Sequence, residues 1–131
     1  MAMRAVAVLV VALVSLSACG PSGPLRVNTI QLGRSLNPDN TIASHAALFK
    51  PSDTIYVSVL TTDAGVGTIA VRWMYFGRLV SEAEKKVSYR DDAATEFHIQ
   101  NSGRFPEGDY TVDVLVDGQS VGTRTFRVSE K

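Results

Sequence analysis

The clearest feature of this chain is a period of two in its bulky apolar residues, which occurs in three segments. Residues 54–60, 68–76 and 110–116 each place their bulky apolar side chains at every second position. The alternating residues are Ile55, Val57 and Val59, then Ile69, Val71, Trp73 and Tyr75, then Tyr110, Val112, Val114 and Val116. Because successive side chains of a strand point to opposite faces, this period of two predicts half-buried β-strands.

Weaker segments complete the pattern. Val87 and Tyr89 indicate a further strand, and residues 95–100 place Phe97 and Ile99 on one face. We expect strands from Val27 onward, because no segment after residue 18 holds a helical period of apolar residues. The pattern therefore predicts one all-β domain over residues 27–131.

A turn signal connects the last two predicted strands. Asp117-Gly118 is the dipeptide that favours a two-residue type I′ hairpin, in which both turn residues have positive φ. This turn predicts that Val116 faces Gln119 and that Val114 faces Val121.

The apolar residues that follow do not keep this register. The hairpin register would place Thr123 and Thr125 inward, but the apolar residues are Phe126 and Val128, at even positions. The strand must therefore contain one extra residue between Val121 and Phe126. We expect a β-bulge at Gly122. The first strand shows the same change of parity, because Leu25 and Val27 have odd numbers whereas Ile30 and Leu32 have even numbers. This change predicts a strand that bends from one sheet to another.

These strands resemble an immunoglobulin-like β-sandwich of about seven antiparallel strands. The similarity rests on Trp73 in a central strand and on the segment Pro106-Glu107-Gly108-Asp109-Tyr110-Thr111-Val112, which resembles a tyrosine corner at the start of the penultimate strand. It covers roughly residues 27–128. The chain lacks both core cysteines of antibody domains and is closer to cysteine-free sandwiches of bacterial envelope proteins. The resemblance implies a fold, and such folds host many functions.

The start of the chain resembles a bacterial lipoprotein signal. Residues 1–18 combine a basic start with an apolar run of 12 residues from Ala5 to Leu16, too short to span a bilayer at about 20 residues. Leu16-Ser17-Ala18-Cys19 is similar to a lipobox and contains the single cysteine. The resemblance implies cleavage before Cys19 and its acylation, which would anchor the chain to the membrane through lipid. An ordinary secretory signal is the alternative.

The sequence after Cys19 predicts where the domain would act. Residues 19–26 form a lipidated cysteine and a short Gly/Pro linker, which would hold the domain close to the membrane. Gly20 follows the cysteine, where an Asp would favour the inner membrane of enterobacteria, so we expect the outer membrane. After cleavage, 13 acidic and 12 basic residues remain, a formal charge of −1, which argues against nucleic-acid binding.

The sequence shows no combination of residues that is typical of an enzyme. The only histidines are His45 and His98, and no strand-turn-helix motif activates Ser58 or Ser88 as a nucleophile. We therefore expect neither catalysis nor a cofactor. A histidine alone on a strand is usually a solvated side chain.

Two loops rich in oxygen ligands raise the question of a calcium site. Asn37, Asp39 and Asn40 lie in one loop, and Asp91-Asp92 lies in another. Asn and Asp are also the residues that turns require, and no EF-hand spacing is present, so we favour turns and predict no metal. Glu82, Glu84 and Lys85-Lys86 indicate a solvated loop or a protected edge strand.

The segment of residues 73–80 contains apolar residues in addition to Trp73 and Tyr75, which are expected to face the core. Met74 and Phe76 alternate with Trp73 and Tyr75, so they are expected on the opposite face of the sheet, and Leu79 and Val80 follow them. Exposed Met and aromatic side chains are enriched at interaction surfaces. The alternative is that these side chains pack under a long connection at residues 81–94.

The sequence therefore predicts a non-enzymatic envelope lipoprotein that binds or scaffolds an envelope protein partner. Met74, Phe76, Leu79 and Val80 are the candidate protein-binding residues, and Cys19 is the candidate lipid-attachment residue. A small ligand-binding or inhibitory domain that uses its loops is the alternative function.

Overall fold

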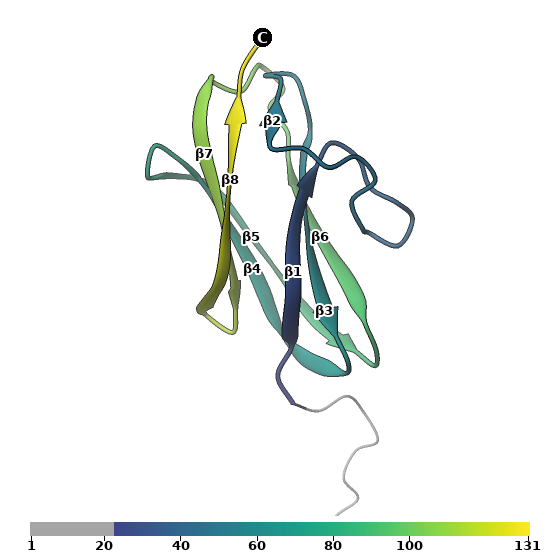
Figure 1. Cartoon of the computed structure of the whole chain (residues 1–131). Helices are drawn as coiled ribbons and strands as arrows, with labels where there is room; N and C mark the ends of the chain where they lie inside the picture. Colours follow the sequence, from purple (N-terminus) through teal and green to yellow (C-terminus); the bar gives the residue numbers. More distant parts are fainter. Residues whose placement is uncertain (1–22) are drawn as a thin grey trace, which may run out of the picture.

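The computed structural model describes residues 23–131, which form eight β-strands in two facing sheets (Figure 1). The signal-like segment, Cys19 and residues 20–22 of the linker lie outside the described residues. The strands are β1 (Arg26–Gly33), β2 (Leu48–Phe49), β3 (Ile55–Thr62), β4 (Gly65–Tyr75), β5 (Arg78–Tyr89), β6 (Ala93–Ile99), β7 (Gly108–Val116) and β8 (Gln119–Val128). No helix in residues 23–131 has the length and apolar character needed to cross a membrane.

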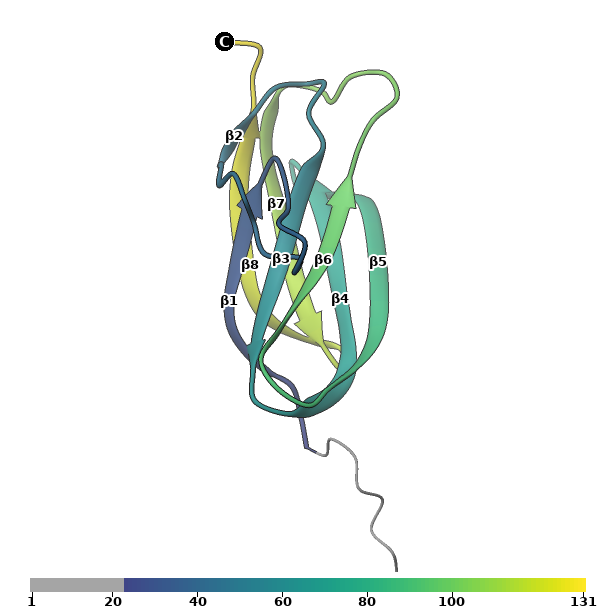
Figure 2. The same cartoon turned by 90° about the vertical axis from the view of Figure 1, so that its right-hand side faces the viewer.

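One sheet has three strands in the order β1-β3-β6, and the other has five in the order β2-β8-β7-β4-β5. All pairings are antiparallel except that of the two-residue β2 with β8, which is parallel. Figure 2 shows the two sheets stacked face to face. The immunoglobulin-like sandwich is therefore confirmed, with one short strand more than the seven expected.

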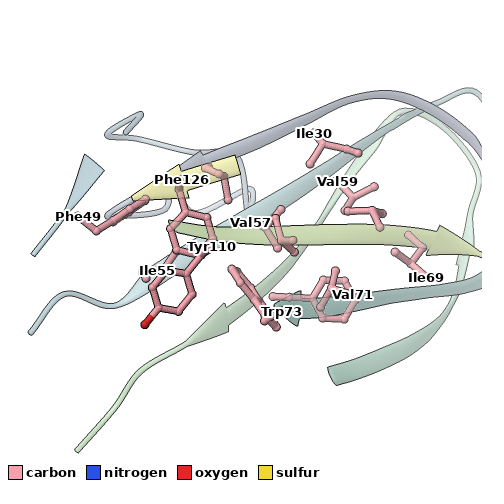
Figure 3. Packing of buried hydrophobic residues seen from close by; sticks show 14 of the residues in the cluster. Ile30, Phe49, Ile55, Val57, Val59, Ile69, Val71, Trp73, Tyr110 and Phe126 are labelled. Atoms are coloured by element: carbon pink, nitrogen blue, oxygen red, sulfur yellow. The ribbon is translucent and has the colours of Figure 1, made fainter. Parts of the chain in front are cut away.

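The core lies between the sheets and consists of the predicted stripes. Side chains from β3, β4 and β7 meet there and are almost completely shielded from solvent (Figure 3). The predicted members that are fully or nearly fully buried are Ile55, Val57, Val59, Ile69, Val71, Trp73, Tyr110, Val112 and Val114. Within the described residues, every buried side-chain nitrogen or oxygen has a hydrogen-bond partner.

Aromatic side chains fill one end of this core. Phe126 contacts the edge of Trp73 at 6.0 Å between ring centroids and stacks on Tyr110 at 5.2 Å. The Tyr110 hydroxyl donates to the carbonyl oxygen of Pro106 over 2.7 Å. This bond to a residue four positions upstream is the tyrosine corner that the sequence predicted.

The last hairpin agrees with the predicted turn but not with the predicted bulge. Asp117 and Gly118 have φ values of 49° and 85°, as a type I′ turn requires, and Val116 pairs with Gln119. However, Val114 pairs with Gly122, so Val121 is the extra residue. The bulge lies one position before the predicted one. The parity switch in β1 corresponds to a register shift between Val27 and Thr29. However, among the strands of residues 23–131, β1 pairs only with β3, so the expected bend of this strand from one sheet to the other is wrong.

The expected long connection at residues 81–94 is wrong. Most of this segment belongs to β5, which pairs with β4 from Arg78 to Tyr89 and forms an edge of the five-stranded sheet. The alternation was hard to detect because β5 exposes nearly all its side chains, so neither of its faces needs apolar residues. Of the two interpretations of the charged residues 82–86, the edge strand is correct.

Candidate functional site

The β4–β5 hairpin turns through Phe76 and Gly77, whose φ values are 46° and 75°. Both residues of such a two-residue turn need positive φ, which Asn, Asp and Gly adopt more easily than other residues. In residues 23–131, the remaining non-glycine residues with positive φ are Asn40, Asp63 and Asp117. Phe76 is therefore an unfavourable choice for its turn, and strained residues of this kind cluster at binding sites.

The hairpin exposes three large apolar side chains. Phe76 is 67% exposed, Leu79 45% and Val80 50%. Leu79 pairs with Met74 whereas Ser81 pairs with Trp73, so Val80 is an extra residue in the ladder. Because this bulge interrupts the alternation of β5, two consecutive apolar side chains are exposed.

The structure brings the four predicted residues into one hairpin but not onto one face. Met74 is half-buried on the outer face of the five-stranded sheet, where it pairs with Leu79 and with Thr111 of β7. Phe76 lies in the turn, so the expectation that it continues the strand beside Met74 is wrong. The alternative of complete cover by a loop at residues 81–94 also fails for Phe76. We call Phe76, Leu79 and Val80 the hairpin patch.

A pocket of about 470 Å³ lies beside the hairpin, between β5 and the loop that leads from β6 to β7. Its apolar lining includes Val80, Ile99 and Phe105, and Tyr75 and Tyr110 also border it. The Tyr75 hydroxyl donates to the carbonyl oxygen of Glu107 over 2.8 Å. Burial, and to a smaller extent Tyr75, raises the pKa of Tyr110 to about 12. Both hydroxyl groups are thus hydrogen-bonded within the domain.

A second hollow, of about 550 Å³, lies on the other side of the turn. Phe76 and Gly77 border it together with Thr111, Phe126 and Arg127. The Phe76 ring contacts the edge of Tyr75 at 4.6 Å between centroids, so one side of the ring is supported and the rest projects into solvent. The patch therefore forms a ridge between two hollows, a shape suited to a partner with a complementary groove or strand.

The hairpin patch lies at the end of the domain opposite the N-terminal linker. Pro24 pairs with Val66 at the start of β4, and the hairpin follows the end of that strand at Tyr75. At about 3.3 Å per residue, β4 separates the two by about 30 Å. Figures 1 and 2 both show the start of β1 at one end of the domain and the β4–β5 turn near the other.

Ser58 and His98, two of the residues considered for catalysis, both form contacts with polar groups of their own domain. Ser58 is buried and donates its hydroxyl to the carbonyl oxygen of Asn40 over 2.7 Å. Nδ1 of His98 lies 3.0 Å from Oε2 of Glu96. Burial raises the pKa of Glu96, but the hydrogen bond to His98 and the charges of Lys85 and His98 outweigh it and lower the pKa overall. Ser58 therefore does not form a hydrogen-bonded chain with His98.

The oxygen-rich loops also bond within the domain. The carboxylate of Asp39 accepts hydrogen bonds from the hydroxyl of Thr41 over 2.5 Å and from its backbone N–H over 3.0 Å, which lowers the Asp39 pKa. Asp92 accepts a hydrogen bond from the backbone N–H of Asp63 over 2.7 Å. Within residues 23–131, no group of three His, Cys, Asp or Glu side chains is arranged to hold a metal. These Asp residues therefore act as turn residues here.

Comparison with known proteins identifies a family and a fold. The profile of a family described as Domain of unknown function (DUF8428) matches residues 30–129. No curated protein matches the sequence significantly. An immunoglobulin-like protein of Pseudomonas aeruginosa, PA1606, superimposes with a TM-score of 0.58 at 12% identity, over 84% of this chain and 100% of that one.

A second structural neighbour is a mutant β-glucosidase of Listeria innocua in complex with laminaribiose. It superimposes with a TM-score of 0.52 at 16% identity, over 77% of this chain but only 16% of the enzyme. At these identities the likeness shows the fold alone, and the chain spans about one sixth of that enzyme. The immunoglobulin-like fold is thus shown, and the functional argument depends on the residues of this chain.

Proposed function

This chain belongs to the DUF8428 family, and we propose that it is a non-enzymatic lipoprotein of the bacterial envelope that binds another protein through its hairpin patch. Cys19 carries the lipid that holds it at a membrane, and Gly20 in place of Asp favours the outer one. The immunoglobulin-like domain is the binding module. Neither a cofactor nor nucleic acid takes part.

The observation that carries this proposal is the exposed ring of Phe76 in a turn that suits Asn or Gly better. An Asn at this position would relieve the turn and remove an apolar group from water. The ring packs on Tyr75 and against Gly108, but Phe76 stays 67% exposed, so the stability of the isolated domain gives only part of the reason for Phe76. Large aromatic side chains dominate binding energy when a partner covers them, which supplies the missing reason.

The position of the hairpin patch fits a lipid anchor at the other end of the domain. The linker of residues 19–26 would keep the end near Pro24 at the membrane. The patch, about 30 Å further along β4, would then face away from the lipid and towards proteins of the envelope. The anchor thus restricts the search for a partner to a layer close to the membrane.

Site-specific photo-crosslinking in intact cells tests the proposal. A benzophenone amino acid replaces Leu79 in the hairpin patch, and in the control it replaces Val121, an exposed apolar residue outside the patch. We expect one protein to be crosslinked through position 79 and not through position 121. Equal crosslinking at both positions, or none at position 79 when the protein is correctly localised, would refute a partner site at the hairpin.

The pocket beside the hairpin favours the alternative of a small ligand-binding domain, because it combines apolar side chains and two tyrosines with the polar residues His98, Gln100 and Asn101. The same experiment separates the two functions. A soluble ligand that binds in the pocket, without any crosslinked protein, would support the alternative and contradict the proposal.

A further inference from the structure

The two sheets have four edge strands, and three of them have edge groups that are already occupied. In β1, the carbonyl oxygen of Ile30 accepts a hydrogen bond from Nε of Arg124 over 3.0 Å, and that of Leu32 accepts one from the backbone N–H of Ala46 over 3.1 Å. In the two-residue β2, the carbonyl oxygen of Leu48 accepts a hydrogen bond from the Arg34 guanidinium.

The third occupied edge is β6. Nζ of Lys85 donates to the carbonyl oxygen of Glu96 over 2.5 Å and lies 4.9 Å from the centre of the Phe97 ring. Lys85 is thus turned into the gap between the sheets, where its charge is satisfied. It closes the edge of β6 and leaves the outer edge of β5 uncovered.

The fourth edge, β5, is long and open. It has 12 residues, and within residues 23–131 no backbone hydrogen bond reaches it apart from those of its ladder with β4. Figure 2 shows β5 at the rim of the sheet. An edge strand of this length with free N–H and C=O groups is a template for pairing with another strand. The charges at residues 82–86, the inward-pointing Lys85 and the bulge at Val80 protect β5 against unspecific pairing, so we expect only a strand of matching charge to add to it.

We propose that β5 binds an extended segment of the partner protein, which adds antiparallel to the edge as a sixth strand of the larger sheet. The inference rests on the proposed function, because it specifies how the partner binds next to the hairpin patch. Main-chain hydrogen bonds would supply affinity and the alternate side chains specificity, as in other cases of strand addition.

The charges on the outer face of β5 define the chemistry of that segment. Glu82, Glu84 and Lys86 pair with Arg72, Ala70 and Thr68 of β4, so they lie on the face opposite the core stripe. Opposite charges directly across two strands stabilise their pairing, and like charges oppose it. The complementary segment carries basic residues two positions apart, facing Glu82 and Glu84, and an acidic residue facing Lys86.

The inner face of β5 adds a second requirement. Ser81 and Ala83 are small and pair with Trp73 and Val71, and Ser81 borders the pocket beside the hairpin. The residues of an added strand that face Ser81 and Ala83 would extend over this pocket. Apolar residues there would meet Val80, Ile99 and Phe105, whereas His98, Gln100 and Asn101 form the polar part of the lining.

The same charges disfavour a second copy of this chain as the occupant. In a symmetric antiparallel pair of β5 strands, a residue near the two-fold axis faces its own copy. Axes at Glu82, Glu84, Lys85 or Lys86 place two identical charges opposite each other, and an axis at Ala83 places Glu82 opposite Glu84. Every central register therefore contains a like-charge pair.

Synthetic peptides test the inference on the full-length protein in detergent. The complementary peptide contains Glu-Val-Lys-Val-Lys-Val between two threonines, and the control peptide has its Glu and Lys residues exchanged. We expect the complementary peptide to bind at least roughly tenfold more tightly and to slow hydrogen exchange of β5 amides, because three charge pairs change sign between the two.

A charge-exchanged protein provides the matched control. The triple variant Glu82→Lys, Glu84→Lys, Lys86→Glu should reverse the preference, whereas Asp109→Lys with Glu130→Lys, away from β5, should preserve it. Binding of neither peptide, equal binding of both, or protection outside β5 would overturn the inference. A free protein that is already dimeric, with protected β5 amides, would also overturn it in favour of self-pairing.

The two proposals fail separately. Crosslinking through position 79 together with a negative peptide result would leave the partner site at the hairpin standing and remove only strand addition. Peptide binding without any crosslinked protein in cells would show an open edge and would contradict the proposed function.

Discussion

Gly122 and Ile30 pack so closely across the two sheets that a side chain at position 122 would overlap with the isoleucine. A Cβ placed on Gly122 would lie 2.7 Å from Cδ1 of Ile30, a distance that real Cβ atoms essentially never show. Gly122 follows the extra residue Val121 in β8 and pairs with Val114. The glycine therefore serves close packing between β8 and β1 rather than the bulge itself.

This contact predicts an interaction between two substitutions. Gly122→Ala should lower the free energy of unfolding by about 1 to 3 kcal/mol, because the buried Ile30 side chain must move. Ile30→Val removes Cδ1, so Gly122→Ala should cost much less in that background than in the wild type. Denaturant unfolding of the two single variants and the double variant measures the coupling. Strictly additive effects would show that the two residues do not meet.

The tyrosine corner predicts that removal of the Tyr110 hydroxyl oxygen lowers the stability of the domain. Tyr110→Phe should lower the free energy of unfolding by about 1 to 3 kcal/mol, because the carbonyl group of Pro106 loses its donor in a mostly buried place. Trp73→Ala should cost about 3 to 5 kcal/mol through the cavity it leaves. Urea midpoints that match the wild type for both variants would contradict the account of the core.

The raised pKa of Tyr110 predicts a loss of stability at alkaline pH. The unfolded phenol ionises near pH 10, but the folded one stays neutral until about pH 12. Between about pH 10 and pH 12, the folded Tyr110 therefore keeps a proton that the unfolded one has lost. The stability that Tyr110 contributes is intact below about pH 10 and falls as pH rises towards 12. Since one pH unit corresponds to about 1.4 kcal/mol, the loss is roughly 2 to 3 kcal/mol.

Tyr110→Phe is the control for this titration, because the other tyrosines remain. The stability difference between wild type and Tyr110→Phe should shrink from pH 9 to pH 12 when unfolding is followed by tryptophan fluorescence. A difference that is constant over this range would mean that the Tyr110 hydroxyl titrates normally.

The proposed lipid anchor predicts the chemistry of the mature N-terminus. Intact-mass analysis of protein from membranes should show a chain that begins at Cys19 and carries acyl groups. Cys19→Ser should leave the protein unprocessed or release it from the outer-membrane fraction, because the acyl chains supply the anchoring energy. An unmodified thiol on the mature chain would contradict this part of the proposal.

The sequence predicted the strands that have one buried face, but of β5, which has none, it indicated only the end at Val87 and Tyr89 and left residues 82–86 as a loop or an edge strand. Ile69, Val71 and Trp73 alternate because β4 has the core on one side, whereas β5 exposes nearly all of its residues and shows no period. Gly122 suggested the wrong position for the bulge because it contacts Ile30, a residue 92 positions away that no local pattern could reveal. Turn and tyrosine-corner signals succeeded because they depend on local backbone geometry.

The sequence identified the residues of the candidate site but did not predict their three-dimensional arrangement. Met74, Phe76, Leu79 and Val80 stood out because their number exceeded the needs of the core stripe. The turn at Phe76-Gly77 was missed, since Phe is uncommon at positive φ, and the bulge at Val80 could not be inferred. The pocket residue Phe105 was missed as well, because it lies in a loop and belongs to no period.

The central claim is that the hairpin patch binds a partner and does not serve stability. The most direct measurement compares the unfolding midpoint and the yield of crosslinked partner on one preparation of Phe76→Asn with Leu79→Ser. Asn suits the turn, so we expect an unfolding midpoint equal to or above that of the wild type. The partner yield should fall at least roughly tenfold, because the exposed anchors are gone. A lowered midpoint with an unchanged partner yield would contradict the claim.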